Sequence, residues 1–284
     1  MKSLSDLQQD WNDLADIDAM WSICSDPEMQ YNRWDQETFF ETGREDIRKI
    51  LNVADKLGVR VQKGRVLDFG CGIGRLTQAL AEEFDDCYGV DISPKMIQLA
   101  EGFNQFGNRV KYVLNQRDDL RVFADNYFDF IYTIEVLQHM NPILMQKYLQ
   151  EFIRILNAGG VLIFQVPIHH LVFDEKTSRL KSLPLFHPKR VLNKFKGLLI
   201  GHDDSIRYYR LRKFGFSKKW LYDHFGLRPT IEMYCLDETL LFKIFEGGGA
   251  ELISLTKSPN VPGDLLMGTY IAVKHSEFNN YNAV

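Results

Sequence analysis

The chain has 284 residues, of which 45% are hydrophobic and 25% charged, values typical of an ordinary globular protein. No stretch approaches the ~20 consecutive apolar residues that span a bilayer, and the first residues lack the apolar core of a secretory signal, so a cytoplasmic protein is expected. Four scattered cysteines lack the spacing of metal ligands, and no metal site is expected.

Basic residues gather in one part of the sequence. Between Ile168 and Thr230 there are fourteen Lys and Arg residues and five Asp and Glu residues, so this segment carries +9, whereas the whole chain carries −4 and the remainder −13. A region of one charge sign in an acidic protein attracts anionic ligands or surfaces. The alternative is a solvated basic face without a binding role.

The chain begins with segments of helical periodicity. Apolar residues recur at roughly helical spacing over residues 6–30, and residues 39–57 predict an amphipathic helix that stops at Gly58. Short apolar runs then alternate with helical segments, which predicts a parallel sheet with helices on both faces. The predicted strands are 65–69, 87–90, 110–114, 128–133 and 160–166, and the predicted helices between them are 75–84, 94–103 and 142–156.

The regular alternation stops after Val166 and resumes near residue 237 with a helix, followed by predicted strands at 250–256 and 266–274. Loops of this length in compact domains are usually functional or disordered. A segment that leaves the fifth strand emerges at the ligand-binding edge of such a sheet. We therefore predict a helical lid segment at 1–60, a core at 61–167, a mostly helical cap at 168–232, completion of the core at 233–275 and a tail at 276–284.

The strongest motif is VLDFGCGIG, residues 66–74, where a buried strand turns into a helix. Glycines there let the backbone turn tightly and approach a ligand, although dinucleotide folds share a bare Gly-x-Gly. Asp68 discriminates between the ligands, because a carboxylate repels the pyrophosphate of a dinucleotide and attracts the ammonium and sulfonium of S-adenosylmethionine. Its charge favours S-adenosylmethionine as the cofactor and disfavours a dehydrogenase.

A second acidic residue ends the next predicted strand, in YGVDIS, residues 88–93. The carboxylate of Asp91 can accept two hydrogen bonds from a ribose diol. Ile92 and Met96 offer apolar walls to an adenine. Considered alone, Asp91 would be an acidic residue at a helix start, where the helix dipole favours it.

These motifs, with FDFIYTIEVLQHM (128–140) and FIRILNAGGVLIFQVP (152–167), resemble the class I S-adenosylmethionine-dependent methyltransferases, specifically the group of small-molecule and ubiquinone-biosynthesis enzymes. The resemblance implies a Rossmann-like α/β fold whose seven-stranded sheet has the order 3-2-1-4-5-7-6, with the last strand antiparallel. Together with the lid and cap segments, this gives a helical lid before the core and a helical insertion after the fifth strand. The resemblance also implies that Asp68, Gly70 and Gly72 hold the methionine end of the cofactor, Asp91 the ribose, and Ile92 and Met96 the adenine.

Further cofactor contacts are expected around this core. The family often has an acidic residue after the third strand that accepts from the adenine amino group; Gln116 occupies that place here, and Asp118 takes it if the turn is longer. Thr133, after the fourth strand, is expected to line the methionine end. Related enzymes close an N-terminal lid over the cofactor. In this chain the lid would supply Tyr31, Trp34, Phe39 and Gly43.

The aromatic side chains of this lid segment would face the sulfonium through cation–π attraction, or alternatively pack between helices. Three histidines are candidate general bases, since histidine titrates near neutral pH. His139 follows the fourth strand, in a place where the family often has a histidine without catalytic need. His169 and His170 follow the fifth strand, where acceptor-binding loops leave the sheet. As a metal pair the last two lack further ligands at recognisable spacing.

We therefore expect an enzyme that moves a methyl group from S-adenosylmethionine to a small-molecule acceptor by in-line transfer. The finer expectation is an anionic, lipid-linked or sugar-linked acceptor. Its contacts are expected at Arg207, Arg210, Arg212 and Lys213, unless these residues pair with acids of the core. Methylation of RNA or protein and a non-catalytic binding protein stay as alternatives. No nucleic-acid partner is expected, because the sequence after the fourth strand lacks an Asn/Asp-Pro-Pro-Tyr motif.

Overall fold

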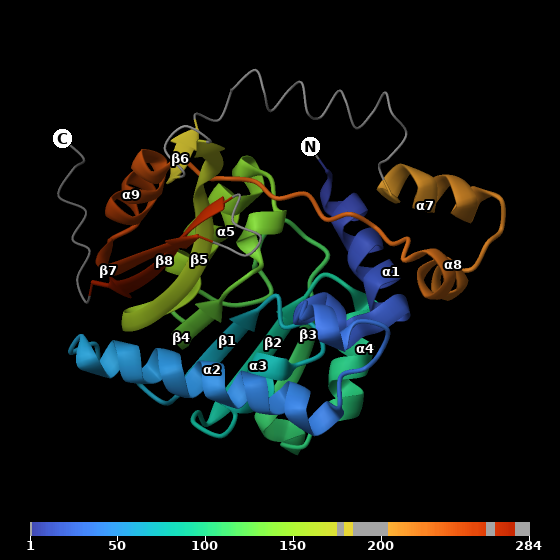
Figure 1. Ribbon diagram of the computed structural model, residues 1–284. Helices are drawn as coiled ribbons and strands as arrows, with labels where there is room; N and C mark the ends of the chain where they lie inside the picture. Colours follow the sequence, from blue (N-terminus) through green and yellow to red (C-terminus); the bar gives the residue numbers. More distant parts are fainter. Residues whose placement is uncertain (1, 175–178, 184–203, 260–264, 276–284) are drawn as a thin grey trace.

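The computed structural model describes residues 2–174, 179–183, 204–259 and 265–275 (Figure 1). Its centre is a twisted sheet whose strands follow the order β3-β2-β1-β4-β5-β8-β7. The neighbours from β3 to β5 pair in parallel, whereas β8 runs antiparallel to both β5 and β7. This arrangement confirms the strand order predicted from the resemblance. The strands are β1 (Arg65–Phe69), β2 (Asp86–Asp91), β3 (Val110–Leu114), β4 (Phe128–Thr133), β5 (Leu156–Asp174), β6 (Arg179–Leu183), β7 (Ala250–Pro259) and β8 (Leu265–Lys274).

Helices cover both faces of the sheet. On one face α2 (Gln36–Lys56) and α3 (Arg75–Leu80) bury Ile47, Ala54 and Leu80 against β1 and β4. On the other face α5 (Pro142–Ile155) and α9 (Glu238–Gly247) bury Phe152 and Phe245 against the sheet. The remaining helices are α1 (Leu4–Ile23), α4 (Pro94–Phe103), α7 (Asp204–Lys213) and α8 (Lys218–Phe225).

Local sequence signals explain where several helices begin. The hydroxyl oxygen of Ser93 accepts from the backbone N–H of Met96, and Pro94 occupies the first turn, as predicted for the start of α4. Ser3 and Asp6 form a capping box at the start of α1. Helix α1 is kinked at Asp18, whose φ and ψ of −160° and 84° are not helical. Past this kink, the helix runs on over the glycine turn that follows β1.

The described residues that follow Val166 begin as strand, whereas a mostly helical cap was predicted over residues 168–232, of which 175–178 and 184–203 lie outside the described part of the chain. Strand β5 runs on to Asp174 instead of ending at Val166, and its last residues pair with the antiparallel strand β6. The cause is the length of β8, which gives the backbone of β5 a partner as far as His170. Among the described residues the helices of this segment are α7 and α8, whereas residues 184–203 lie outside the described part of the chain. Residues 227–237 connect α8 to α9 without regular structure.

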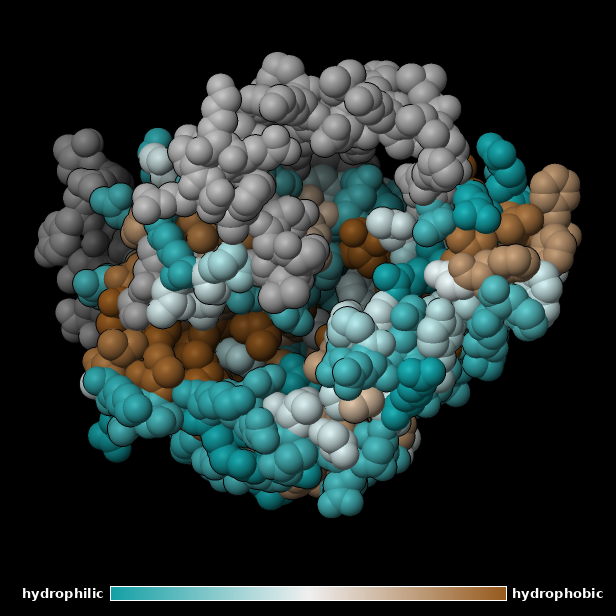
Figure 2. Space-filling model, in the orientation of Figure 1, coloured by the Kyte–Doolittle hydropathy of each residue, from teal (hydrophilic) through white to brown (hydrophobic). Residues whose placement is uncertain are grey.

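The cap formed by α7 and α8 lies beside α1 (Figure 1). Tyr208 of α7 and Leu221 and Tyr222 of α8 are fully buried in a cluster with Ile17 of α1. On the face shown in Figure 2, apolar residues gather beside β7 and β8 and again over α7 and α8. Within the described part of the chain, no helix is both long enough and apolar enough to cross a membrane.

Candidate active site

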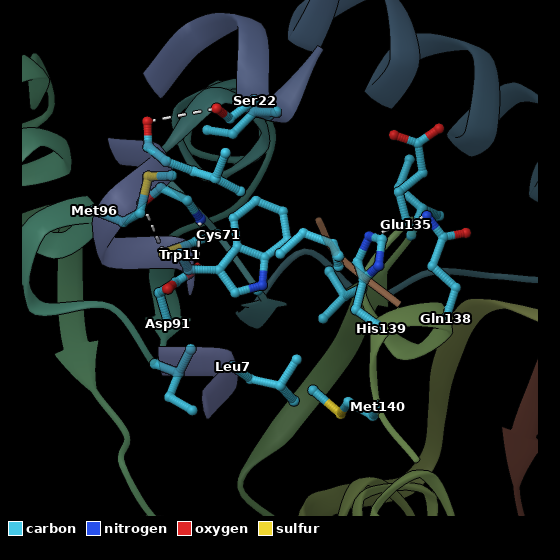
Figure 3. A pocket seen from close by; sticks show the side chains of 18 of the residues that line it. Leu7, Trp11, Ser22, Cys71, Asp91, Met96, Glu135, Gln138, His139 and Met140 are labelled. Carbon is cyan, nitrogen blue, oxygen red and sulfur yellow. Dashed lines mark hydrogen bonds between the residues drawn. The ribbon is translucent and has the colours of Figure 1, made fainter. Parts of the chain in front are cut away.

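A cavity of about 730 Å³ opens at the carboxyl ends of the central strands. This volume lies in the range of small-molecule and cofactor sites, and its position is where open α/β sheets bind ligands. Its walls come from α1, the turns after β1, β2 and β4, Asn115 after β3, and residues 228–231 with Met233 after the cap. Figure 3 shows a pocket at this place, with Asp91 and Met96 on one side and Gln138, His139 and Met140 on the other.

The turn after β1 requires glycine. Gly70, Gly72 and Gly74 have φ values of 79°, 54° and 87°, in the left-handed region that other residues adopt at a cost. A Cβ atom at Gly70 would overlap the side chain of Val136, and one at Gly72 would overlap that of Ile23. Because both positions line the cavity, the turn brings bare backbone to it.

Asp91 lines the cavity and is held rigidly. Its Oδ2 accepts from the backbone N–H of Gly72 at 2.9 Å, and its Oδ1 accepts from that of Ser93 at 2.8 Å. Burial raises the pKa of this carboxyl group, an effect that the backbone hydrogen bonds oppose. Ile92 and Met96 line the same wall, so the structure brings together five of the predicted cofactor residues: Gly70, Gly72, Asp91, Ile92 and Met96.

Asp68 and Thr133 lie behind the cavity wall instead of facing it. Asp68 is buried and accepts from Oγ1 of Thr77 at 2.6 Å, and burial raises the pKa of its carboxyl group to about 7. The hydroxyl of Thr133 is buried without a hydrogen-bond partner among the described residues. Ile134 and Glu135, which follow it, do line the cavity. Glu135 adopts a φ of 58°, and its burial raises the pKa of its carboxyl group.

The predicted adenine-amine acceptors do not reach the cavity. Gln116 is exposed, and Asp118 forms an ion pair with Lys147 on the surface. Asn115 lines the cavity instead, with its backbone N–H donating to the carbonyl of Asp91 at 2.9 Å and its Nδ2 donating to that of Asp119 at 2.9 Å. The alternation of side chains at the end of β3 could have placed Asn115 at the cavity. The sequence analysis missed this residue because it looked for an acidic side chain.

The predicted lid residues lie away from the cavity. Tyr31 is exposed and contacts the Tyr222 ring at 5.0 Å, whereas Phe39 is fully buried and meets Trp34 edge to face. Gly43 lies where α2 crosses α3, and a Cβ there would overlap the carbonyl oxygen of Arg75. The expectation that Tyr31, Trp34, Phe39 and Gly43 line the cofactor site is therefore corrected, since their contacts hold the segment to the core.

Helix α1 covers the cavity in their place. Leu7, Trp11 and Leu14 line it, followed by Trp21, Ser22 and Ile23 after the kink. Figure 3 shows the indole of Trp11 between Asp91 and His139, and the rings of Trp11 and His139 meet edge to face at 5.5 Å. The spacing of residues 7, 11 and 14 on one helical face was the available signal.

His139 is the predicted base that reaches the cavity, and it is neutral there. Burial lowers the pKa of its imidazole to about 4. Its Nδ1 lies 3.4 Å from the carbonyl oxygen of Glu232, which only accepts, so Nδ1 carries the proton and Nε2 accepts from the side-chain amide of Gln138 at 3.2 Å. His169 and His170 lie on β5, opposite Leu266 and Leu265 of β8, and do not line the cavity.

The predicted anion contacts of the cap also lie elsewhere. Arg207 pairs with Asp204, Arg212 donates to the carbonyl of Phe216, and neither these residues nor Arg210 and Lys213 line the cavity. Arg228 lines it instead, with its guanidinium 4.2 Å from the centre of the Trp21 ring. Its Nη1 is buried without a hydrogen-bond partner among the described residues, and burial lowers the pKa of the guanidinium.

No cluster of three or more potential metal ligands occurs within the described residues. The residues that line the cavity offer backbone donors, a fixed carboxylate, aromatic and apolar walls, and a guanidinium without an ion pair in the described part of the chain. This set can bind a polar small molecule that carries a diol and a flat ring.

Comparisons with known proteins agree with this geometry. Residues 67–164 match a family model described as a methyltransferase domain. An ajmaline N-methyltransferase of Rauvolfia serpentina is 27% identical over 108 residues, which are 37% of this chain and 36% of that protein. A ubiquinone biosynthesis O-methyltransferase of Nitrosomonas europaea is 26% identical over 139 residues, 48% of this chain and 58% of that protein. The chain thus spans about a third to three-fifths of the length of these curated relatives.

A solved structure shares the fold over nearly the whole chain. The crystal structure of magnesium protoporphyrin IX methyltransferase from Synechocystis, with bound SAH, matches with a TM-score of 0.56 at 17% identity. The match covers 96% of this chain and 100% of that one. At this identity the likeness concerns the fold.

Proposed function

Because residues 67–164 of this chain belong to the methyltransferase domain family and the fold is that of class I methyltransferases, we propose that the protein is an enzyme that transfers a methyl group from S-adenosylmethionine to a small molecule. The observation that carries this proposal is the hydrogen bond from the backbone N–H of Gly72 to the carboxylate of Asp91. A bare glycine backbone in the left-handed region and a carboxylate fixed by two backbone N–H groups meet in one wall of the cavity.

The residues present fit this cofactor. The glycine turn forms a cradle that a Cβ would fill, and Asp91 would accept from the ribose hydroxyls. Ile92, Met96 and Asn115 would contact the adenine. Asp68 would lie behind the methionine end, where the ammonium of the bound cofactor would favour the charged form of its carboxyl group. When bound, the cofactor supplies an activated methyl group on a sulfonium. Gly70, Gly72, Ile92 and Met96 were predicted for these roles, and Asn115 takes the place of Gln116 and Asp118.

The chain's own residues orient and enclose the reactants. Trp11 and the rest of α1 cover the cavity, which excludes water and raises the strength of polar contacts inside it. Neutral His139 can take a proton at Nε2 once the amide of Gln138 has turned away, and Glu135 is a second carboxyl group at the same wall. Alignment of the acceptor is the main contribution that such a transfer needs from the protein.

A covered cavity favours a small acceptor over an RNA or protein chain. We propose that the acceptor carries an anionic group and that Arg228, not the cap residues Arg207 to Lys213, binds it. A guanidinium that lies next to an aromatic ring, with a buried Nη1 that has no hydrogen-bond partner among the described residues, suits a carboxylate or phosphate. The related proteins are named for N-methylation and O-methylation.

Two measurements test the proposed function. Calorimetry with S-adenosylhomocysteine and with NAD should show binding of the former alone, and binding of NAD alone would overturn the cofactor. Labelled S-adenosylmethionine incubated with a cell extract should transfer its methyl group to the small-molecule fraction. Label that is found only in RNA or protein would instead support the macromolecular alternative.

Substitution of Arg228 tests the anionic group. Arg228→Gln should raise the Michaelis constant of an acceptor by about 10- to 100-fold, the range expected for a charged hydrogen bond, while Arg228→Lys keeps part of the affinity. The carboxylate of the cofactor is the other possible anion. If Arg228→Gln weakens S-adenosylhomocysteine but not methylthioadenosine, which lacks the amino-acid end, Arg228 binds the cofactor and the acceptor proposal fails.

A further inference from the structure

Four aromatic side chains are exposed on the cap within twelve residues. Phe214 is 77% exposed, Phe225 57%, Phe216 41% and Trp220 38%. We call these four residues the cap aromatic patch. Apolar colouring over α7 and α8 stands out at the edge of the molecule in Figure 2. Grouped exposed rings of this kind mark interaction surfaces, whereas single exposed apolar residues are ordinary.

The patch is separate from the packing that holds the cap. The inner side of the cap buries Tyr208, Leu221 and Tyr222 against Ile17 of α1. Three rings of the patch contact one another instead: Phe216 stacks on Trp220 at 5.2 Å, and Phe225 meets Trp220 edge to face at 5.3 Å. These three rings support one another before any partner binds, which lowers the cost of docking.

Three basic residues in the last turn of α7 stand next to the patch in the sequence. Arg207 and Lys219 pair with Asp204 and Asp223 within their own helices, and Lys218 pairs with α1. Arg210, Arg212 and Lys213 form no ion pair with any described residue, although Arg212 donates to the backbone carbonyl of Phe216. We call these three the cap basic residues. They carry positive charge on a chain whose formal net charge is −4.

We propose that this cap docks on the surface of an anionic phospholipid bilayer. The cap aromatic patch enters the interface between headgroups and acyl chains, and the cap basic residues contact the headgroup phosphates. Exposed phenylalanines with no polar tip suit the acyl region, and tryptophan with arginine and lysine suits the interface. The patch gives the apolar contribution and the cap basic residues the electrostatic one, the two signals that stable peripheral binding needs.

A nucleic acid fits this surface less well. Single-stranded bases need exposed ring faces for stacking. Trp220 already stacks on Phe216 and on His224, whose ring centre lies 4.8 Å from its own. Three residues after Phe225 the chain reaches Arg228 in the cavity wall, so docking would bring this wall toward the bilayer. The proposal itself does not depend on methyl transfer.

Sedimentation of the purified full chain with vesicles tests the proposal. We expect binding to vesicles of 70% phosphatidylcholine and 30% phosphatidylglycerol, weaker binding to pure phosphatidylcholine, and release by high salt. The double substitution Phe214→Ser with Phe225→Ser should lower the partition coefficient by about tenfold or more. Lys213→Glu with Arg210→Glu should lower it by about fivefold or more for each charge.

Matched controls use residues far from the cap. Ile143→Ser with Phe242→Ser changes two residues that are 62% and 48% exposed on α5 and α9, and should leave partition unchanged. Circular dichroism on all variants checks that they fold. Wild-type protein that stays in the supernatant with anionic vesicles overturns the proposal. So does equal loss in the control pair, or a dimer in sedimentation equilibrium that the patch substitutions dissociate, since the patch would then bind a second copy.

Discussion

Asp91 and Gly72, 19 residues apart, are joined by a hydrogen bond of 2.9 Å from the backbone N–H of the glycine to the carboxylate Oδ2. The bond ties the end of β2 to the turn that follows β1. Since Ser93 donates to the other oxygen, the carboxylate keeps one orientation before any ligand arrives. Such preorganisation lowers the cost of binding.

Asp91→Ala should therefore damage both binding and the turn. We expect the affinity for S-adenosylhomocysteine to fall by at least 10-fold, because each charged hydrogen bond contributes roughly 1.5–3 kcal/mol. Asp91→Asn should lie between wild type and alanine. Asp86→Ala serves as the control, because Asp86 lies at the other end of β2 and pairs with Lys111 on the surface. Calorimetry that finds wild-type affinity in Asp91→Ala would remove Asp91 from the site.

The sequence predicted this wall of the cavity because its contacts are local to one motif and its neighbouring strand. The family prediction is confirmed by the match over residues 67–164, and the strand order by the sheet itself. Gly70, Gly72 and Asp91 lie at strand ends that parallel pairing brings to one edge. The sequence prediction did not include Asn115, because a shift of one residue in the strand register at the end of β3 decides which side chain faces inward.

Gly43→Ala separates two explanations for that glycine. The structure places it under the Arg75 carbonyl, so a methyl group should push α2 from α3 and lower the free energy of unfolding by about 1–3 kcal/mol. A role in cofactor contact predicts lost affinity with stability intact. Gly102→Ala is the control, since a Cβ there meets nothing within 4 Å and should stabilise α4 by about 0.5–1 kcal/mol. Urea denaturation measures both variants.

His139 should make the protein sensitive to acid. The pKa of its imidazole is about 4 in the folded chain, against 6.5 for an ordinary histidine, so the unfolded chain takes up the proton first as the pH falls. The free energy of unfolding should then decrease from about pH 6.5 to pH 4 and show no contribution from His139 above that window. His139→Gln should reduce this slope by up to about 1.4 kcal/mol per pH unit.

Urea denaturation at several pH values measures the slope. His224→Gln, which changes an exposed histidine of the cap, is the control and should leave the slope as in the wild type. If both variants keep the wild-type slope, His139 is not buried in its neutral form, and its place in the cavity wall must be revised.

The remaining errors of the sequence prediction concern contacts between distant segments. The lid segment was predicted at residues 1–60, but its cofactor contacts were assigned to residues 31–43, whereas residues of α1 line the cavity. The spacing of residues 7, 11 and 14 indicates an apolar helical face, but it does not show what this face covers. The charge of residues 168–230 was counted correctly, but a count does not tell which side chain faces the cavity. Among the described basic residues of this segment, Arg228 lines the cavity. Lys218 finds its partners about 200 residues earlier in the chain.

Lys218 of α8 should hold the cap to α1. Its Nζ lies 2.6 Å from Asp13 and 2.9 Å from Asp16, and Asp13 also accepts from the hydroxyl of Tyr208 at 2.8 Å. The Asp13 side chain is only 4% exposed, so Lys218→Met leaves a buried carboxylate without its cation. We expect a loss of about 1–3 kcal/mol in the free energy of unfolding, less than for a fully buried pair because water reaches Lys218.

Lys219→Met is the matched control, because the neighbouring lysine pairs with Asp223 at the surface and should cost less than about 0.5 kcal/mol. Adding Asp13→Asn to Lys218→Met should restore part of the stability, since the buried charge is then gone. Because α1 covers the cavity, Lys218→Met should also speed the dissociation of S-adenosylhomocysteine in stopped-flow measurements. Equal stability of the two lysine variants, with no change in dissociation, would show that the apolar cluster around Ile17 alone holds the cap.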